Sequence, residues 1–197
     1  MGEIWAIILA AGESKRMGRP KMLLTFNNRT MLENVIGNVT GSDVDNTLVV
    51  IGAERVAITE LVNKSSVKHC YNDNYKKGML SSVKCGFRNL PSDYEAVLVF
   101  QGDQPLIFPN VINRLIAEYR SSERGIVIPV YNKKRGHPIL IDRKYRAEIE
   151  KISDDKGLRE LAYLFSEDVL EAETDDPGIL RDFDTYKEYI EELNQKL

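Results

Sequence analysis

The sequence predicts an α/β domain with a mostly parallel central sheet that helices cover on both faces. Short apolar runs alternate with longer amphipathic stretches along the 197 residues, as in folds built from strand–helix–strand units. The runs are apolar throughout, which is typical of strands buried on both faces. No internal repeat, low-complexity segment or linker divides the sequence, so we expect one domain over residues 1–197.

The first half of the chain carries local signals for strands and helices in alternation. Thr30 and Glu33 have the spacing of a capping box and predict the start of a helix. Apolar residues recur every fourth position from Met79, which predicts another helix. The expected elements are strands at 4–9, 47–51 and 67–71 and helices at 31–39, 58–63 and 78–89.

The second half continues the alternation. The β-branched run at 96–100 predicts a strand, and Pro109 suits the first turn of the helix that follows. A basic turn at 132–136 separates two further apolar runs. The expected elements are strands at 96–100, 125–130, 138–141 and 180–183 and helices at 109–120, 143–151, 156–165 and 185–197.

Composition excludes several classes of protein. The formal net charge is −3, so no global basic field attracts nucleic acid. The first apolar run is too short for a signal peptide or a membrane span, and we expect a cytoplasmic protein that binds neither membrane nor nucleic acid. The two cysteines, Cys70 and Cys85, are expected to be reduced thiols, since a soft-metal site would need more ligands.

The segment at 9–21, LAAGESKRMGRPK, follows the first expected strand and carries the most information. Ala10, Ala11 and Gly12 leave no bulk in the way of a phosphate that approaches the backbone N–H groups. Arg16 offers a planar fork to phosphate oxygens, and Lys21 offers a mobile positive charge. The spacing matches neither GxxxxGK[ST] nor GxGxxG. The alternative is a basic surface turn, but this loop lies where α/β sheets bind ligands, and we expect a polyphosphate site.

The GDQP sequence at 102–105 places Asp103 at the carboxyl end of the next central strand. Magnesium prefers one or two carboxylates together with phosphate oxygens, so Asp103 is the expected metal ligand beside a nucleoside triphosphate. A second carboxylate is expected from Asp182 or Asp184, and we favour Asp182. The alternatives are an ordinary Gly-Asp turn at Asp103 and a helix cap at Asp184.

Three other polar segments could face a substrate. His137 lies in a Gly-Pro turn beside Arg135, although a lone histidine is more often structural. The acidic turn at 154–156 opens a helix and has the composition of an ordinary N-terminal cap. The helix start at 78–82 could present N–H groups and hydroxyls to a nucleobase, although serine is common at such positions.

These segments, in this order, resemble the MobA-like nucleotidyltransferase family over essentially the whole chain. Ala11 and the GHP turn resemble its cytidylyltransferase branch, whereas the guanylyltransferase branch typically has LAGG. The sequence departs from the branch at Tyr186, where a proline is frequent, and at 154–156. The resemblance is carried by LAAGESKRMGRPK at 9–21, GMLSSVKCG at 78–86, GDQPL at 102–106, RGHPIL at 135–140, DKGLR at 155–159 and DFDT at 182–185.

The resemblance implies a Rossmann-like nucleotidyltransferase fold and a role for each segment. Catalysis would rest on Arg16, Lys21 and Asp103, with magnesium held by Asp103 and Asp182. The remaining implied contacts are Leu9, Ala10, Ala11, Gly12, Ser14, Gly78, Ser81 and Ser82 for the nucleotide, and Arg135, Gly136, His137, Pro138 and Arg159 for the acceptor.

The implied reaction is Mg²⁺-dependent transfer of CMP from CTP to the phosphate of molybdopterin, with release of pyrophosphate. A recipient molybdoenzyme or its chaperone would take the product. One alternative is a related pyrophosphorylase that acts on another small phosphorylated acceptor, such as a sugar phosphate. The other is an accessory protein that binds nucleotide or cofactor without turnover.

Overall fold

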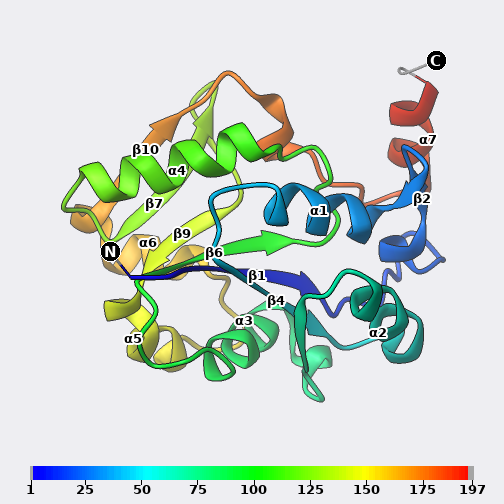
Figure 1. Ribbon diagram of the computed structural model, residues 1–197, viewed down its shortest axis with the longest axis horizontal. Coiled ribbons are helices and arrows are strands. Elements are labelled where there is room, and N and C mark those ends of the chain that lie inside the picture. Colours follow the sequence, from blue (N-terminus) through cyan, green and yellow to red (C-terminus); the bar gives the residue numbers. More distant parts are fainter. Residues whose placement is uncertain (1, 195–197) are drawn as a thin grey trace.

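A computed structural model describes residues 2–194 of the chain, and most of its strands lie in one mixed sheet (Figure 1). The strands are β1 (Ile4–Ala10), β2 (Thr25–Phe26), β3 (Arg29–Thr30), β4 (Asn46–Ile51), β5 (Lys68–Tyr71), β6 (Ala96–Gln101), β7 (Ile126–Tyr131), β8 (Lys134–Arg135), β9 (Ile139–Asp142) and β10 (Val169–Glu173). The sheet order is β10-β7-β9-β6-β1-β4-β5, β8 pairs with β7, and β2 and β3 form a separate hairpin.

The sheet is parallel around β1 and mixed beyond β6. β1 pairs in parallel with β4 and β6, β4 with β5, and β7 with β10. β9 runs antiparallel to both β6 and β7. The mostly parallel α/β fold is therefore confirmed. The carboxyl ends of β1, β4 and β6 meet at one edge, where α/β sheets bind ligands.

One expectation about the C-terminal third is wrong, and one strand there was not expected. Leu180–Phe183 is not a strand. A 3₁₀ turn at Pro177–Leu180 includes its first residue, and the Asp176 side chain accepts from Gly178 N at 2.8 Å at the start of that turn. The last strand of the sheet is instead β10. Its sequence, VLEAE, mixes apolar and acidic residues, as an edge strand with one wet side does.

Helices cover both faces of the sheet, as expected. The even-numbered side chains of β1 pack with α1, α2 and α4, and the odd-numbered ones pack with α3, α5 and α6. Figure 1 shows α1 and α4 on one side of the sheet and α3 and α5 on the other. The helices are α1 (Met31–Thr40), α2 (Arg55–Lys64), α3 (Met79–Arg88), α4 (Pro109–Ser121), α5 (Arg146–Lys151), α6 (Arg159–Leu164) and α7 (Tyr186–Asn194).

Local signals fix the helix starts. The Thr30 hydroxyl accepts from Glu33 N at 3.2 Å, and Glu33 accepts from Thr30 N at 2.7 Å, so the expected capping box is confirmed. Pro109 occupies the first turn of α4, as expected. The helix expected at 185–197 begins at Tyr186, and its last three residues lie outside the described part of the chain.

A small apolar cluster joins α7 to the loop that follows β1 (residues 11–21, the opening loop). It contains Met17, Phe26, Met31, Phe183 and Tyr189, and the rings of Phe26 and Phe183 lie 5.5 Å apart. The Tyr189 hydroxyl donates to the backbone oxygen of Thr25 at 2.5 Å. The C-terminal segment is thus held against the loop that follows β1.

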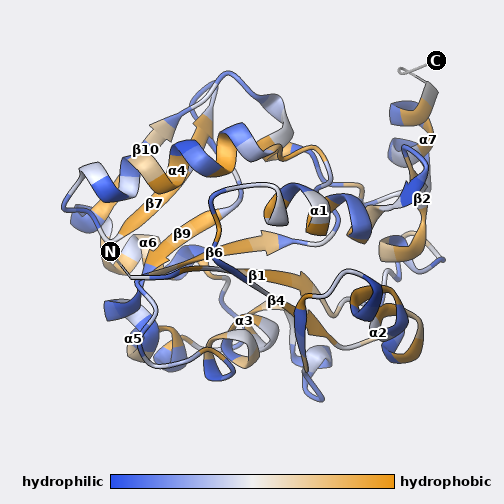
Figure 2. Ribbon diagram, in the orientation of Figure 1, coloured by the Kyte–Doolittle hydropathy of each residue, from blue (hydrophilic) through white to orange (hydrophobic). Residues whose placement is uncertain are grey.

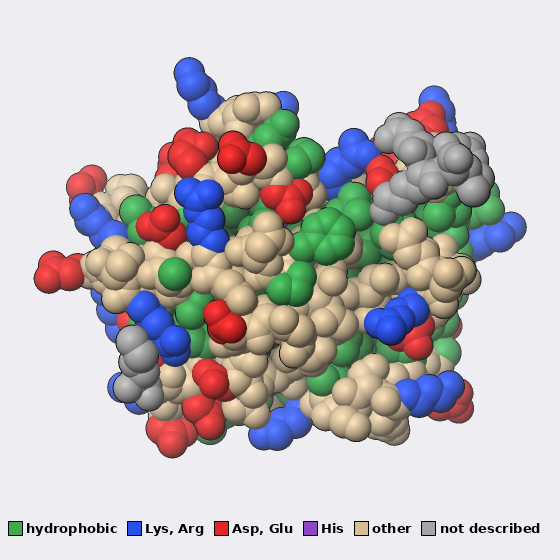
Figure 3. All heavy atoms as spheres, turned by 45° about the horizontal axis from the view of Figure 1, so that its top comes forward, with side chains coloured by type: hydrophobic (Ala, Val, Ile, Leu, Met, Phe, Trp, Pro, Cys, Tyr) green, Lys and Arg blue, Asp and Glu red, His purple; other side chains and the backbone are tan. Residues whose placement is uncertain are grey.

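Hydropathy follows these layers. Figure 2 shows β1, β6, β7 and β9 of the central sheet as mostly apolar and the helices as mixed. On the face in Figure 3, acidic and basic side chains are interspersed rather than gathered into one basic patch. Within residues 2–194, no helix is both long and apolar enough to cross a bilayer.

Candidate active site

The loop after β1 is shaped by its own hydrogen bonds. The Ser14 hydroxyl accepts from Lys21 N at 3.1 Å, and Ser14 O accepts from Met17 N at 3.0 Å. Gly18 has φ +67°, which glycine adopts without strain. These bonds fold the loop back so that Lys21, in a 3₁₀ turn at Lys21–Leu23, lies beside the sheet edge.

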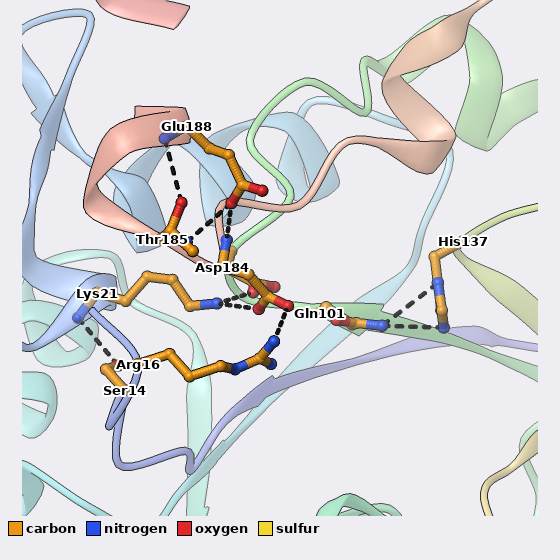
Figure 4. A network of polar contacts seen from close by, with 9 residues as sticks. Ser14, Arg16, Lys21, Gln101, His137, Asp184, Thr185 and Glu188 are labelled. Atoms are coloured by element: carbon orange, nitrogen blue, oxygen red, sulfur yellow. Dashed lines mark hydrogen bonds and ion pairs between the residues drawn. The ribbon is translucent and has the colours of Figure 1, made fainter. Parts of the chain in front are cut away.

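Two basic residues of this loop meet two carboxylates from distant parts of the chain (Figure 4). Lys21 Nζ lies 2.5 Å from Asp103 Oδ2 and 3.2 Å from Asp184 Oδ1. Arg16 reaches the other oxygen of Asp184 at 2.6 Å. The structure therefore brings together Arg16, Lys21 and Asp103, the three residues expected to carry catalysis.

Burial and charge act against each other in this cluster. Burial lowers the pKa of Lys21, but Asp103 and Asp184 outweigh it and the net shift is upward, so Lys21 stays protonated at neutral pH. Burial raises the pKa of Asp182, and the neighbouring charges of Asp184 and Asp103 raise it further. Asp182 therefore faces two other carboxylates, and a cation bound between them would offset their repulsion.

The cluster forms one wall of a cavity of ≈ 520 Å³ at the carboxyl edge of the sheet. A Cβ built on Gly12 would meet nothing within 4 Å, so Gly12 borders open space. The cavity is large enough for a nucleotide and has basic and acidic groups at one end. Its lining is Leu9, Ala11, Gly12, Glu13, Ser14, Lys15, Arg16, Lys21, Met22, Tyr75, Lys76, Gly78, Met79, Ser82, Gln101, Asp103, Asp182 and Asp184.

Two residues expected to bind nucleotide lie behind this lining. Ala10 is fully buried within β1, with its side chain in the core, because it still pairs with Ile51 of β4. Ser81 is buried, and its hydroxyl donates to Gly78 O at 2.8 Å or to Asn74 O at 3.0 Å. Neither side chain lines the cavity.

The residues expected to hold the acceptor are not gathered in the cavity. Arg135 is exposed and pairs with Glu171 at 2.7 Å, and Arg159 is exposed at the start of α6. A Cβ on Gly136 would lie 2.4 Å from Ile179 O, so only glycine allows this turn to pack there. Pro138 follows the turn into β9 and does not line the cavity.

His137 has an indirect link to the cavity. Its ring lies 3.2 Å from the Gln101 side-chain nitrogen, and Gln101 lines the cavity (Figure 4). Burial lowers the pKa of His137, and the charge of Asp103 opposes this shift only in part. His137 is therefore neutral at neutral pH and supports Gln101 from behind.

Two buried polar residues outside the cavity lining were not expected from the sequence. Asn72, directly after β5, donates to the hydroxyls of both Ser81 and Ser82 at 2.9 Å. Lys84 of α3 donates to Ile152 O at 2.7 Å and to Asp154 at 2.8 Å, which holds the turn before α6 against α3. A buried asparagine or lysine in a sequence gives no local sign of its partners.

The donor set at Asp103 fits a hard cation. Asp103 and Asp182 both line the cavity, and their carboxylate oxygens are the ligand type that Mg²⁺ prefers. Within residues 2–194, no group of three or more histidine, cysteine or acidic side chains is close enough to enclose a metal by itself. One or two carboxylates with phosphate oxygens are the arrangement Mg²⁺ takes beside a nucleotide.

Known proteins resemble this chain over nearly its full length. Residues 6–169 match the MobA-like NTP transferase domain. The molybdenum cofactor cytidylyltransferase of Escherichia coli K12 is 26% identical over 96% of this chain and 95% of its own. The nicotine blue oxidoreductase of Paenarthrobacter nicotinovorans is 28% identical over 79% of each chain. Rv0371c from Mycobacterium tuberculosis H37Rv has a similar crystal structure, with a TM-score of 0.86, 23% identity and 98% of each chain covered.

Proposed function

Because the chain belongs to the MobA-like NTP transferase domain family, we propose that it transfers CMP from CTP to the phosphate of molybdopterin and releases pyrophosphate. The carrying observation is the cluster of Arg16, Lys21 and Asp103 on the wall of a nucleotide-sized cavity. The similarity to a molybdenum cofactor cytidylyltransferase over 96% of the chain supports the choice of nucleotide and acceptor.

The cationic side chains would hold the triphosphate. Arg16 and Lys21 contact Asp184 in this structure, and phosphate oxygens would take the place of that carboxylate. Leu9, Ala11, Gly12 and Ser14 line the same end of the cavity and would approach the phosphates. The loop backbone adds N–H donors without side-chain bulk.

Transfer would follow an in-line displacement. An oxygen of the acceptor phosphate forms a bond to the α-phosphorus, the bond from that phosphorus to the β-phosphate oxygen breaks, and pyrophosphate leaves. A phosphate monoester is already nucleophilic, so this step needs no general base. Lys21 and Arg16 neutralise the charge that develops on the phosphate oxygens, and the walls hold the two reactants in line.

Asp103, with Asp182, would hold Mg²⁺. We favour Asp182 as its partner, because Asp182 lines the cavity, makes no ion pair with any described cation, and faces the charges of Asp103 and Asp184, which a bound cation would offset. When bound, the metal would neutralise phosphate charge and orient the reacting groups.

The nucleobase would lie at the start of α3, beside Gly78 and Ser82. Ala11, typical of the cytidylyltransferase branch, favours CTP over GTP. The acceptor would enter past Gln101, which His137 contacts, and Arg135 and Arg159 would bind it from outside the cavity lining. A molybdoenzyme or its chaperone would receive the product.

A nucleotide panel tests the reaction. Purified protein with Mg²⁺ and molybdopterin is expected to release pyrophosphate with CTP and much more slowly with GTP, ATP or UTP. A sugar phosphate in place of molybdopterin tests the alternative pyrophosphorylase. CTP binding with no pyrophosphate release on adding any acceptor would favour an accessory protein, and turnover of a redox substrate alone would favour an oxidoreductase of the kind named for the Paenarthrobacter relative.

A variant pair tests the metal assignment. Asp103→Ala is expected to abolish transfer while keeping the circular dichroism spectrum of the wild type. Asp175→Ala changes an exposed carboxylate outside the cavity and is the matched control, which should keep transfer. Full turnover by Asp103→Ala with Mg²⁺ and CTP would refute the role of Asp103.

A further inference from the structure

The side chain of Asn72 is a buried amide that hydrogen-bonds to Ser81, Ser82 and Asn74. It is 5% exposed and lies between β5 and the start of α3. Its side-chain nitrogen donates to Ser81 Oγ and to Ser82 Oγ, each at 2.9 Å. Its side-chain oxygen accepts from the backbone N–H of Asn74 at 3.0 Å.

The backbone contact fixes which way this amide faces. A backbone N–H can only donate, so the side-chain atom opposite Asn74 N must be the oxygen. The NH₂ group therefore faces the two serines. Because NH₂ can only donate, both hydroxyl oxygens accept from Asn72.

The two serines differ in what remains for their own hydrogens. The Ser81 hydroxyl has acceptors within the chain at Gly78 O and Asn74 O. The Ser82 hydroxyl accepts from Asn72 and has no acceptor for its hydrogen among the described residues, and Ser82 lines the cavity. The Ser82 O–H is therefore available to donate to a ligand.

We propose that Asn72 is a positioning residue for base selection, because it makes the Ser82 hydroxyl a donor toward the nucleobase. This inference rests on the proposed function only in placing the base at the start of α3. A donor hydroxyl there favours a base whose facing ring nitrogen is unprotonated, such as N3 of cytosine. Uracil and guanine carry an N–H at the corresponding ring position. To accept from it, the Ser82 oxygen must use its second lone pair and turn its hydrogen away from the base, where the described residues offer no acceptor.

Substitutions at Asn72 should change the preference in a defined direction. Asn72→Asp keeps the shape of the side chain but replaces the NH₂ by an acceptor, so the Ser82 O–H turns toward residue 72 and offers a lone pair to the cavity. Asn72→Ala removes the donor and leaves the Ser82 hydroxyl free to rotate. The first change should favour UTP relative to CTP, and the second should weaken the preference without reversing it.

Equilibrium binding of CTP and UTP, measured by titration calorimetry with Mg²⁺ and no acceptor, tests this. We expect the wild type to prefer CTP by about tenfold or more, as sites that donate to or accept from a substrate do. Asn72→Asp should reduce the ratio by about tenfold, and Asn72→Ala by a smaller factor. Asn74→Asp adds the same charge to an exposed side chain two positions away, and its ratio should stay within about twofold of the wild type.

A double variant separates positioning from a general structural effect. In the Ser82→Ala background, where no hydroxyl remains to orient, Asn72→Asp should no longer change the ratio of CTP to UTP affinity. Circular dichroism melting shows which variants fold. If Asn72→Asp does not fold, the same comparison is made with Asn72→Ala, alone and in the Ser82→Ala background.

Three outcomes overturn the inference: a wild type without preference for CTP over UTP, an unchanged ratio in the folded Asn72 variants, or an Asn72→Asp effect that persists in Ser82→Ala. A protein that prefers CTP but transfers no CMP to molybdopterin would instead overturn the proposed function and leave the role of Asn72 standing.

Discussion

Replacing Lys21 by methionine is expected to lower the free energy of unfolding of the nucleotide-free protein by about 3 kcal/mol. The side chains of Lys21 and Asp103 are only 11% and 8% exposed, and their charged atoms lie 2.5 Å apart. Methionine keeps most of the aliphatic stem and removes the charge, so Asp103 would remain buried without its cation. Removing one member of a buried pair costs about 3–5 kcal/mol, and Asp184 at 30% exposure admits some water, which favours the lower end.

Urea unfolding at pH 7, followed by circular dichroism without nucleotide or Mg²⁺, measures this cost. For a chain of this length, the same change should lower the melting temperature by about 6–12 °C. Asp103→Asn should cost less, because Lys21 keeps Asp184 at 3.2 Å. The double variant Lys21→Met/Asp103→Asn removes both charges, so no buried charge of this pair loses its partner. We therefore expect a coupling free energy of at least about 2 kcal/mol.

Two results would refute this reasoning. If Lys21→Met unfolds within about 0.5 kcal/mol of the wild type, the pair is solvated and does not stabilise the fold. If the costs of the two single variants simply add in the double variant, Lys21 and Asp103 do not act on each other. Either result would leave Lys21 free for the nucleotide but without a structural role.

Three further predictions concern titratable groups. The Cys85 thiol should react with iodoacetamide at pH 7.5 well before Cys70, because the contact between them lowers the pKa of Cys85 to about 7 and raises the pKa of Cys70. Mass spectrometry measures the two rates, and equal rates would contradict this. Asp182→Asn should raise the urea midpoint at pH 7, because burial raises the pKa of Asp182 and the folded state disfavours its charge. This gain in stability should vanish as the pH falls below 3.8, the ordinary pKa of an aspartate, since the carboxyl is then protonated in both states. Burial lowers the pKa of His137, so the folded state resists protonation of its ring and the stability of the protein should fall as the pH drops below 6.5. His137→Gln should remove this pH dependence from the urea midpoints. An unchanged pH profile in that variant would contradict the assignment.

The parts of the fold and site that were predictable have short-range signals. β1 is a continuous apolar run, and the capping box of Thr30 and Glu33 fixes the start of α1 within four residues. Arg16, Lys21 and Asp103 were identifiable because each follows a buried strand at the edge where such sheets bind ligands. Their meeting in the structure depends on the parallel pairing of β1 with β6.

The parts that were missed depend on contacts between distant residues. The direction of β9 relative to β6 is not encoded in its own apolar residues, which read alike in parallel and antiparallel strands. Asn72 is a polar residue after a strand, and its role appears only once α3 brings Ser81 and Ser82 against it. The ion pair of Arg135 with Glu171 could not be predicted, because Glu171 belongs to β10, a strand that the sequence pattern did not indicate.

The contact between Asp184 and the basic residues of the opening loop has a consequence for how the protein is made. Arg16 and Lys21 are synthesised before Asp184, which lies more than 160 positions later in the sequence. The two strands that flank β1, β4 and β6, are also synthesised before Asp184. Until Asp184 is synthesised, Lys21 can pair with Asp103 but Arg16 lacks its carboxylate, so a phosphate group that meets the nascent loop can bind Arg16 before Asp184 does.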